Sequence, residues 1–222
     1  MAGEESDPAM TSFVHNLNKQ VMRPLNKGKN LEDDTSSLNR RANGKLEFVV
    51  NTFKKALEPH FEVVNDGYLR KEIKVVDLHG LDKLTMYYTL QNRLLARTYD
   101  LMFHFTVPDD SREDYLELEL EYGGKFSIES AKFVKVSGTK SKAILENLNN
   151  RLLTDRLKTL DFLEFRIRYK PKKKEWDILV TSLIGSAVWN MIPPAFQVIK
   201  PKDVECIRMM EVFELTAHGI TQ

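Results

Sequence analysis

Cysteine is almost absent from this chain, which contains only Cys206 among its 222 residues. A single thiol excludes an intramolecular disulfide and a metal site built from several cysteines, and it is typical of a reducing compartment. The first residues, Met1–Pro8, are acidic and lack the apolar core of a signal or transit peptide. We therefore expect a cytoplasmic protein, or one inside an assembly formed in the cytoplasm.

Net charge is also scarce, because 33 Lys and Arg residues oppose 32 Asp and Glu residues and leave a formal charge of +1. No global field therefore draws the chain to nucleic acid or to a membrane. The sequence has no phosphate-binding glycine loop, dinucleotide fingerprint, nucleophile elbow or His-Glu-x-x-His motif. We predict no catalytic, cofactor-binding or metal-binding residue, and the sequence leans away from an enzyme.

One long stretch, Ile178–Ile199, lacks charge altogether, and its 22 residues match the length of a membrane-spanning helix. Its composition argues against such a helix, because Thr, Ser, Asn and Gln interrupt it and Pro193–Pro194 would break it. We expect instead a buried strand, a turn at Gly185 or at the prolines, and a second buried segment. No transmembrane segment is predicted.

Apolar and polar residues alternate along three successive stretches, Tyr99–Val107, Tyr115–Glu121 and Phe126–Val136. A period of two indicates strands with one face on a core and one in water, so we expect three consecutive antiparallel strands. Two earlier strands are predicted at Tyr68–Val76 and Leu84–Leu94. A β-hairpin with a lysine-rich turn is predicted further on, at 165–183.

Helical spacing of apolar residues predicts a helix over Leu46–Leu57 and another, of about five turns, over Ile144–Leu160. A C-terminal helix is expected from Pro201 to Ala217, although Met209–Ala217 also fits a strand. Strands followed by a helix and further strands favour an α+β fold. We predict an antiparallel, meander-rich sheet with helices packed mainly on one face, plus an N-terminal helical arm.

The N-terminal region, residues 1–44, is predicted to hold a disordered start, a short amphipathic helix over Met10–Val21 and a polar linker. Residues 45–222 are expected to form a single α+β domain. The short helix either packs on its own domain or docks as an arm on a neighbouring subunit, because an isolated helix of this length is marginal in water. Its apolar stripe makes Val14, Leu17 and Val21 candidate partner-binding residues.

Charge is segregated between two of the predicted strands. Glu117, Glu119 and Glu121 form an acidic row, whereas a basic row continues into the lysine-rich turn. If the strands are neighbours, the rows pair across the sheet and fix its register. If they are apart, the basic hairpin becomes a candidate phosphate-binding site for nucleic acid or anionic lipid. Its residues are Arg166, Arg168, Lys170, Lys172, Lys173, Lys174 and Trp176.

Two groups of residues fit an acid–base set, namely His104 with Asp100 on one strand, and Asp77, His79 and Asp82 in one turn. Such residues are more often simply solvated, and Cys206 on an apolar helix face favours a core position. Four residues of the uncharged stretch, around Trp189 and Phe196, are candidates for an exposed apolar patch that binds a partner, namely Trp189, Met191, Ile192 and Phe196.

We therefore predict a non-enzymatic protein that works by protein–protein contact, as a structural subunit of a larger or self-associated assembly. A first alternative is nucleic-acid or anionic-lipid binding through the basic hairpin at 166–176. A second alternative is a small-ligand-binding or hydrolytic protein with a pocket between sheet and helices.

Overall fold

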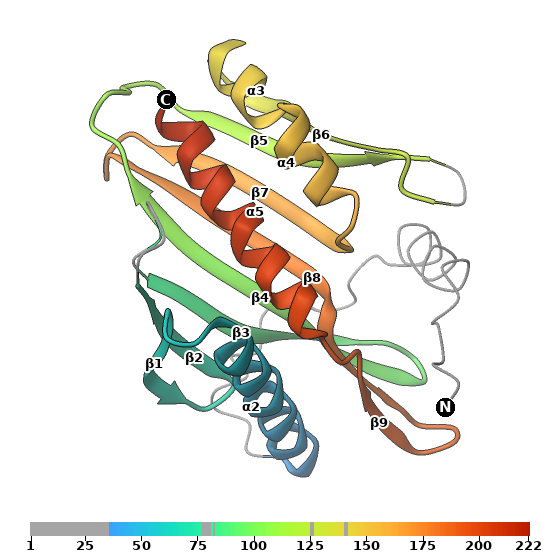
Figure 1. Ribbon diagram of the computed structural model, residues 1–222. Helices are drawn as coiled ribbons and strands as arrows, with labels where there is room; N and C mark the ends of the chain where they lie inside the picture. The colour runs from blue at the N-terminus through green and yellow to red at the C-terminus, as the bar shows by residue number, and fades with distance from the viewer. Residues whose placement is uncertain (1–35, 77–80, 82, 125–126, 140–141) are drawn as a thin grey trace.

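The computed structural model describes residues 36–76, 81, 83–124, 127–139 and 142–222. In this part of the chain a nine-stranded sheet is covered by four helices (Figure 1). The strands are ordered β1-β2-β3-β4-β8-β7-β5-β6, with β9 paired to β8, and each neighbouring pair is antiparallel. The predicted α+β fold with an antiparallel sheet is therefore confirmed. The predicted arm helix at Met10–Val21 lies outside the described residues.

The elements follow one another from a long helix through a strand-rich middle to a C-terminal helix. The helices are α2 (Ser37–Leu57), α3 (Lys142–Leu148), α4 (Arg151–Leu157) and α5 (Asp203–Thr221). The strands are β1 (Phe61–Gly67), β2 (Arg70–Val75), β3 (Lys83–Asn92), β4 (Ala96–Pro108), β5 (Leu116–Gly123), β6 (Ser130–Gly138), β7 (Phe162–Lys170), β8 (Glu175–Asn190) and β9 (Ala195–Val198).

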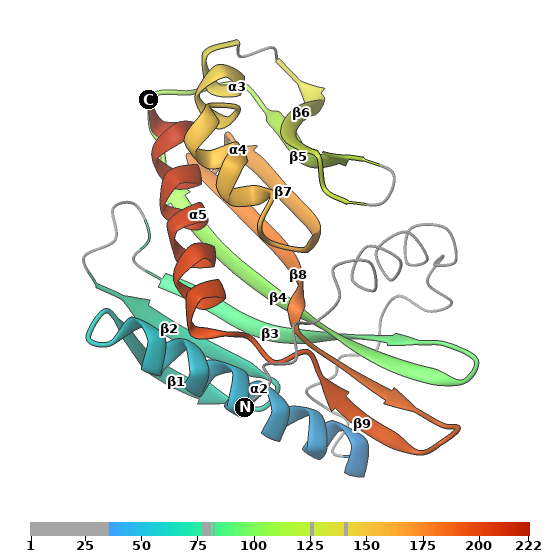
Figure 2. The same cartoon turned by 45° about the vertical axis from the view of Figure 1, so that its right-hand side comes forward.

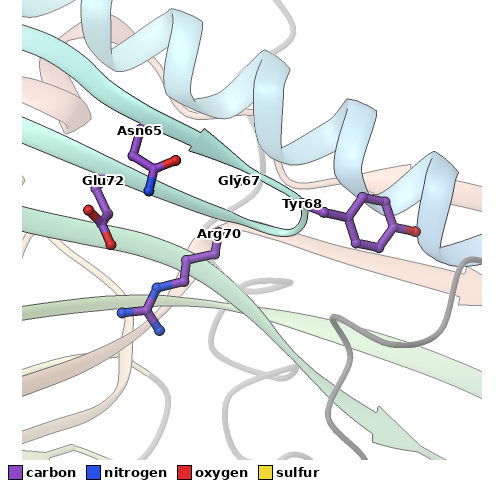
Figure 3. A pocket seen from close by; sticks show the side chains of 5 residues that line it. All are labelled: Asn65, Gly67, Tyr68, Arg70 and Glu72. Atoms are coloured by element: carbon purple, nitrogen blue, oxygen red, sulfur yellow. The ribbon is translucent and has the colours of Figure 1, made fainter.

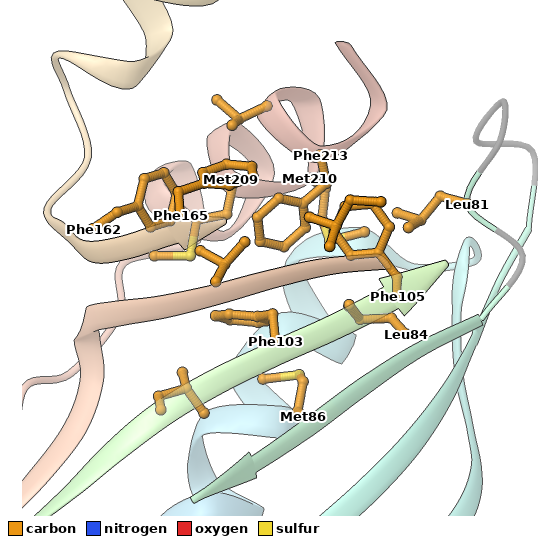
Figure 4. Close-up of a cluster of buried hydrophobic side chains, with 14 of the residues drawn as sticks. Leu81, Leu84, Met86, Phe103, Phe105, Phe162, Phe165, Met209, Met210 and Phe213 are labelled. Atoms are coloured by element: carbon orange, nitrogen blue, oxygen red, sulfur yellow. The ribbon is translucent and has the colours of Figure 1, made fainter. Parts of the chain in front are cut away.

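All four helices lie on one face of the sheet, with α5 between α2 and the α3–α4 pair (Figures 1 and 2). The helix α5 begins with a capping interaction, in which the Lys202 backbone N–H donates to Glu205 Oε2 at 2.7 Å. Its buried face packs on the central strands, where the Phe213 ring lies 5.2 Å from Phe103 and 5.3 Å from Phe105 (Figure 4). Cys206 is fully buried on this face, which confirms its predicted core position.

The prediction that three consecutive strands are neighbours is wrong. Strand β4 pairs with β3 and β8, whereas β5 pairs with β7 and β6, so β8 and β7 are inserted between β4 and β5. The 16-residue β8 is buried along most of its length and needs a neighbour on each side. Local alternation identifies a strand but carries no information about which strand lies next to it.

The long helix α2 begins inside the predicted linker. Residues 37–44 form its first two turns, so the predicted domain boundary after residue 44 falls within a helix. The Ser36 side chain caps the helix by accepting from the Asn39 backbone N–H, and Ala42 is fully buried. The polar residues that suggested a linker occupy mainly the outer face of this helix. The rest of that linker lies outside the described residues.

Two further predictions need correction. The strand expected at Tyr68–Val76 is part of a hairpin, since β1 and β2 meet at a turn that contains Tyr68 and Leu69. The helix expected over Ile144–Leu160 is interrupted at Asn149, whose side chain accepts from the Phe133 N–H at 2.7 Å and donates to the Phe133 carbonyl at 2.9 Å. These bonds satisfy backbone groups on the edge strand β6, which has only β5 as a neighbour.

The remaining predicted elements are confirmed. Strands β7 and β8 form the hairpin with the lysine-rich turn, and α5 is a helix throughout. The uncharged stretch forms the largely buried half of β8, a turn at the prolines and β9. The expected burial of its second segment is wrong, because every residue of β9 is at least partly exposed. Gly185 lies within β8 with a φ of +87°, where the chain changes partner from β7 to β9. None of the helices in the described ranges has the length and apolar content that crossing a bilayer requires.

Candidate interaction surface at the hairpin tip

Two β-turns from distant parts of the chain lie next to each other at one end of the sheet. One connects β3 to β4 and the other connects β8 to β9. The ladder between β4 and β8 pairs Ala96 with Asn190, and the Met191 backbone N–H donates to the Leu95 carbonyl at 3.0 Å. Both hairpins extend together beyond the helices (Figures 1 and 2). The turns are therefore held side by side by backbone bonds.

These turns present four large apolar side chains to solvent. Leu94 is 89% exposed and Ile192 is 75% exposed, while Leu95 and Met191 are about half exposed, at 54% and 45%. We call these four residues the hairpin tip. Single exposed apolar residues are normal on a protein surface, but a contiguous group on adjacent turns is typical of a site that contacts a partner.

The base of the tip is well packed. Trp189 and Phe196 are opposite each other across β8 and β9, and the Phe196 ring lies 5.6 Å from the buried Tyr99 ring. The Tyr99 hydroxyl donates to Asn39 Oδ1 at 2.8 Å, which connects the hairpins to α2. Of the four residues predicted for the apolar patch, Met191 and Ile192 are exposed on the tip, whereas Trp189 and Phe196 are only partly exposed. They support the tip, and the more exposed residues lie beyond them.

Two arginines flank the tip, and we call Arg93 and Arg97 the basic collar. Arg93 lies in the β3–β4 turn, and Arg97 is opposite Trp189 in the β4–β8 ladder. Burial raises the pKa of Asp100 to about 6, against the opposing influence of Arg93. The Asp100 carboxylate accepts from Gln91 Nε2 at 2.6 Å and its residue is only 6% exposed.

The predicted basic hairpin lies at the opposite end of β8, and several of its cations face carboxylates. Arg168 Nε lies 2.6 Å from Glu117 Oε1, and Arg166 Nη2 lies 3.2 Å from Glu119 Oε1. Both are register partners across β5 and β7, so the predicted cross-strand pairing of the two charged rows is confirmed. In the turn, lysine–carboxylate ion pairs join Lys170 to Asp177, Lys173 to Glu175 and Lys174 to Asp110, while Lys172 is exposed.

Trp176, which was predicted to stack on a ligand of the basic hairpin, is fully buried. Its Nε1 donates to Asp109 Oδ2 at 2.9 Å, and its ring packs 5.1 Å from that of Tyr169. A ring in this position has no face available to a base or a lipid. The aromatic component of the predicted phosphate-binding site is therefore missing, because the residue belongs to the core-facing side of β8.

The candidate acid–base residues are distributed over separate contacts. His104 Nε2 donates to Asp177 Oδ1 at 2.8 Å, and this bond, with a further contribution from Lys170, lowers the pKa of Asp177 to about 2. Asp100 instead contacts Gln91, so His104 and Asp100 have different partners. Asp77, His79 and Asp82 lie outside the described residues, as do Val14, Leu17 and Val21. Burial raises the pKa of Cys206 to about 12, which disfavours a thiolate nucleophile.

A shallow hollow of about 320 Å³ lies at the β1–β2 hairpin. Its side chains do not converge, since Tyr68 extends beside α2 while Asn65, Arg70 and Glu72 lie along the strands (Figure 3). Small-ligand sites usually bring a few polar groups together in an apolar cavity. In the described ranges no cluster of three His, Cys, Asp or Glu side chains is arranged to hold a metal ion.

Residues 51–220 match a protein family described as "Protein of unknown function (DUF3156)". The chain belongs to this family. The match covers more than half of the chain and includes both turns of the hairpin tip, the sheet and nearly all of α5. A comparison with curated proteins found no match, and a comparison with solved structures found none either.

Sequence reasoning missed Leu94 and Leu95, which were placed at and just beyond the end of a predicted strand. The sequence did contain one indication of an unusual site. Leu94 and Leu95 are adjacent apolar residues between Arg93 and Arg97, and they break the apolar–polar alternation of a strand. Their proximity to Met191 and Ile192 had no signal in the sequence, since it depends on the pairing of β4 with β8.

Proposed function

We propose that the protein is a non-enzymatic binding protein that docks on a larger partner through the hairpin tip. The observation that carries this proposal is the exposure of four large apolar side chains on two turns joined by the Met191–Leu95 bond. Water contact at these side chains is unfavourable. A partner that covers them recovers roughly 1.5–3 kcal/mol for each one that becomes fully buried.

The packing of the hairpins supports this interpretation. Tyr99 and Phe196 belong to or pack against the hydrophobic core, and they hold the hairpins in place without help from the tip. Leu94 and Ile192 are therefore not needed to bury the hairpins against the fold. Their apolar character is better explained by a contact outside the molecule.

Within the described residues, one face of the sheet carries no helix. The charged side chains on that face pair with one another, which favours a structural role for them rather than a binding role. Arg168 pairs with Glu117, and Asp177 accepts from His104 and pairs with Lys170. Such cross-strand pairs contribute about 0.2–1 kcal/mol each and mainly specify strand register. The four side chains of the tip are apolar and take no part in these charge pairs of the described residues.

A pair of double variants of the full-length chain tests the proposal. The tip variant, Leu94→Ser with Ile192→Ser, removes the most exposed apolar side chains of the tip. The control, Leu152→Ser with Val64→Ser, makes the same kind of change at residues that are 57% and 52% exposed on α4 and β1. Thermal unfolding should show that the tip variant and the wild type have the same stability within about 0.5 kcal/mol.

In extracts of the native cell, fractionation by size and by flotation should place part of the wild-type protein and of the control variant in a bound pool. The tip variant should be recovered as the unbound chain. An equal bound pool for the tip variant would contradict docking through the tip, and so would the absence of a bound pool for the wild type. Purified protein in sedimentation velocity experiments separately tests the self-association that the sequence predicted.

A further inference from the structure

We propose that the partner of the hairpin tip is an anionic membrane surface. In this arrangement Leu94, Leu95, Met191 and Ile192 enter the boundary between headgroups and acyl chains, while the basic collar faces lipid phosphates. This inference rests on the proposed function, because it names the partner for the same tip. Three independent features of the described residues favour a lipid surface over a protein partner.

The first feature is the shape of the apolar surface. The most exposed residues, Leu94 and Ile192, lie in the turns that end two hairpins. These hairpin ends extend beyond the helices (Figure 2). A protein partner would need a hollow that matches both turns, whereas a fluid bilayer adapts to any apolar projection. The Met191–Leu95 backbone bond holds the turns together, so both insert in a single step. Apolar side chains beside basic ones are the pattern of segments that lie in the membrane interface.

The second feature is the charge of the two hairpins. The stretches 86–99 and 178–202 contain Arg93, Arg97, Lys200 and Lys202 but no Asp or Glu. Further arginines, Arg40 and Arg41, are exposed in the first turns of α2, next to the Asn39 that bonds to Tyr99 below the tip. Basic residues close to a bilayer are attracted by anionic lipid headgroups. The whole chain has a formal charge of only +1, so this attraction is local to the tip.

One acidic residue, Asp100, lies close enough to the basic collar to interact with it. Asp100 interacts electrostatically with Arg93, but its residue is 6% exposed and its carboxylate is engaged by Gln91. It therefore lies inside the protein and presents no negative charge to a bilayer. Both arginines of the collar are partly buried. An arginine at a membrane interface characteristically buries its apolar stem and keeps its charged head in the polar layer.

The third feature is the position of Trp189. This partly exposed ring lies at the base of the tip, opposite Arg97 in the β4–β8 ladder. Tryptophan is enriched at the level of lipid headgroups, where one part of the ring meets apolar chains and the N–H meets polar groups. Along the hairpins the apolar residues of the tip therefore lie outermost, and Arg97 and Trp189 lie side by side behind them. Insertion of the tip among acyl chains would place both of these residues at the level of the headgroups.

The test uses the full-length protein with phosphatidylcholine vesicles, with or without phosphatidylglycerol, in a co-sedimentation assay. The wild type should bind only the phosphatidylglycerol-containing vesicles, and added salt should weaken binding. The tip variant, Leu94→Ser with Ile192→Ser, should reduce the partition coefficient on the order of 100-fold or more, because it removes two inserting side chains. The control variant, Leu152→Ser with Val64→Ser, should bind like the wild type.

A second pair of variants tests the charge. Replacing the collar, Arg93→Gln with Arg97→Gln, should lower the partition coefficient roughly 30-fold. Each cation near an anionic surface contributes a factor of roughly five, and the two factors multiply. The matched control, Lys142→Gln with Arg151→Gln, removes two cations whose side chains are 90% and 95% exposed on α3 and α4. It should leave binding unchanged. Equal losses in both variants would overturn the role of the collar.

Tryptophan fluorescence gives a readout of insertion that does not depend on sedimentation. The chain has two tryptophans, and Trp176 is fully buried, so brominated acyl chains should quench Trp189 selectively. Quenching in the wild type and its loss in the tip variant would support insertion. A wild type that binds no anionic vesicles, or that binds without quenching, overturns the membrane inference.

The failure of the inference is distinguishable from the failure of the proposed function. If the native extract yields a tip-dependent bound pool that contains protein but no lipid, docking through the tip stands and the membrane is wrong. If the extract yields no tip-dependent pool and the vesicles bind nothing, both proposals are wrong.

Discussion

Met191 donates its backbone N–H to the carbonyl oxygen of Leu95 at 3.0 Å, and this bond joins the turns of two different hairpins. It continues the ladder in which Ala96 pairs with Asn190 and Arg97 with Trp189. A relationship between two turns far apart in the sequence thus places four apolar side chains on one surface. The candidate site exists only because β4 and β8 remain paired up to the ends that carry the two turns.

Gly185, the single glycine of β8, should not tolerate replacement. Its φ is +87°, and an added Cβ would lie 2.5 Å from Leu101 Cδ2 and 3.2 Å from Val49 Cγ1. We expect Gly185→Ala to lower the free energy of unfolding by about 2–4 kcal/mol in urea denaturation. Gly44→Ala in α2 is the control, because nothing lies within 4 Å of its added Cβ. That change should stabilise the protein by about 0.5–1 kcal/mol. Similar stabilities for both variants would contradict the backbone geometry of β8.

Asp177 should stabilise the fold above its unfolded-state pKa. The hydrogen bond from His104 and the charge of Lys170 lower the folded-state pKa to about 2 from the ordinary aspartate value of 3.8. The stabilisation is therefore fully present above about pH 4 and is lost as the pH falls toward 2. We expect Asp177→Asn to cost about 2 kcal/mol at pH 7 and almost nothing at pH 2. Unfolding free energies measured across this range would contradict the prediction if the difference were independent of pH.

Asp100 should have the opposite effect. Burial raises its folded-state pKa to about 6 from 3.8, so its ionisation weakens the folded state as the pH rises from about 4 to above 6. We expect Asp100→Asn to stabilise the protein on the order of 2 kcal/mol at pH 7, and to be neutral below about pH 4. Thermal unfolding at several pH values measures this. A variant that is less stable than the wild type at pH 7 would show that the contact between the Asp100 carboxylate and Gln91 outweighs burial.

Glu117 and Arg168 should be energetically coupled. Their side chains meet at 2.6 Å as register partners on β5 and β7, and Glu117 is only 14% exposed. A double-mutant cycle with Glu117→Gln and Arg168→Met should give a coupling of about 0.5–1 kcal/mol. The pair Lys142–Glu146 on α3 is the control, because its side chains are 90% and 65% exposed, and its coupling should be at most about 0.3–0.5 kcal/mol. Equal coupling energies for the two pairs would contradict the prediction that the Glu117–Arg168 pair helps to specify the register of β5 and β7.

Much of the local structure was predictable from residue patterns. The alternation around Phe103 and Phe105 identified β4, and the residues on either side of the lysine-rich turn identified the β7–β8 hairpin. The pairing of the Glu117 row with the Arg168 row was predicted as well, because opposite charges on two solvent-facing strands suggest neighbours. Helix α2 was predicted too short, since capping by Ser36 and burial of Ala42 outweighed a polar composition.

The candidate site was only partly predictable. The predicted apolar patch included Met191 and Ile192, which are exposed on the tip. It also included Trp189 and Phe196, which lie at the base of the tip. Leu94 and Leu95 were not identified, because exposure is a property of the surroundings and not of the residue type. Trp176 shows the opposite case, in which a residue expected to be exposed is buried. It follows the lysine-rich turn in the sequence, yet its ring is fully buried.

The sequence by itself determined the fold class, the identity of most strands and the core position of Cys206, because periodicity and side-chain polarity act over a few residues. The tertiary structure alone decided the strand order, the insertion of β8 and β7 between β4 and β5, and the meeting of the two turns at the tip. The physical reason is that backbone hydrogen bonds between strands are chemically alike. The partner of each strand is therefore selected by packing of the whole sheet against α5 and α2, which no local pattern records.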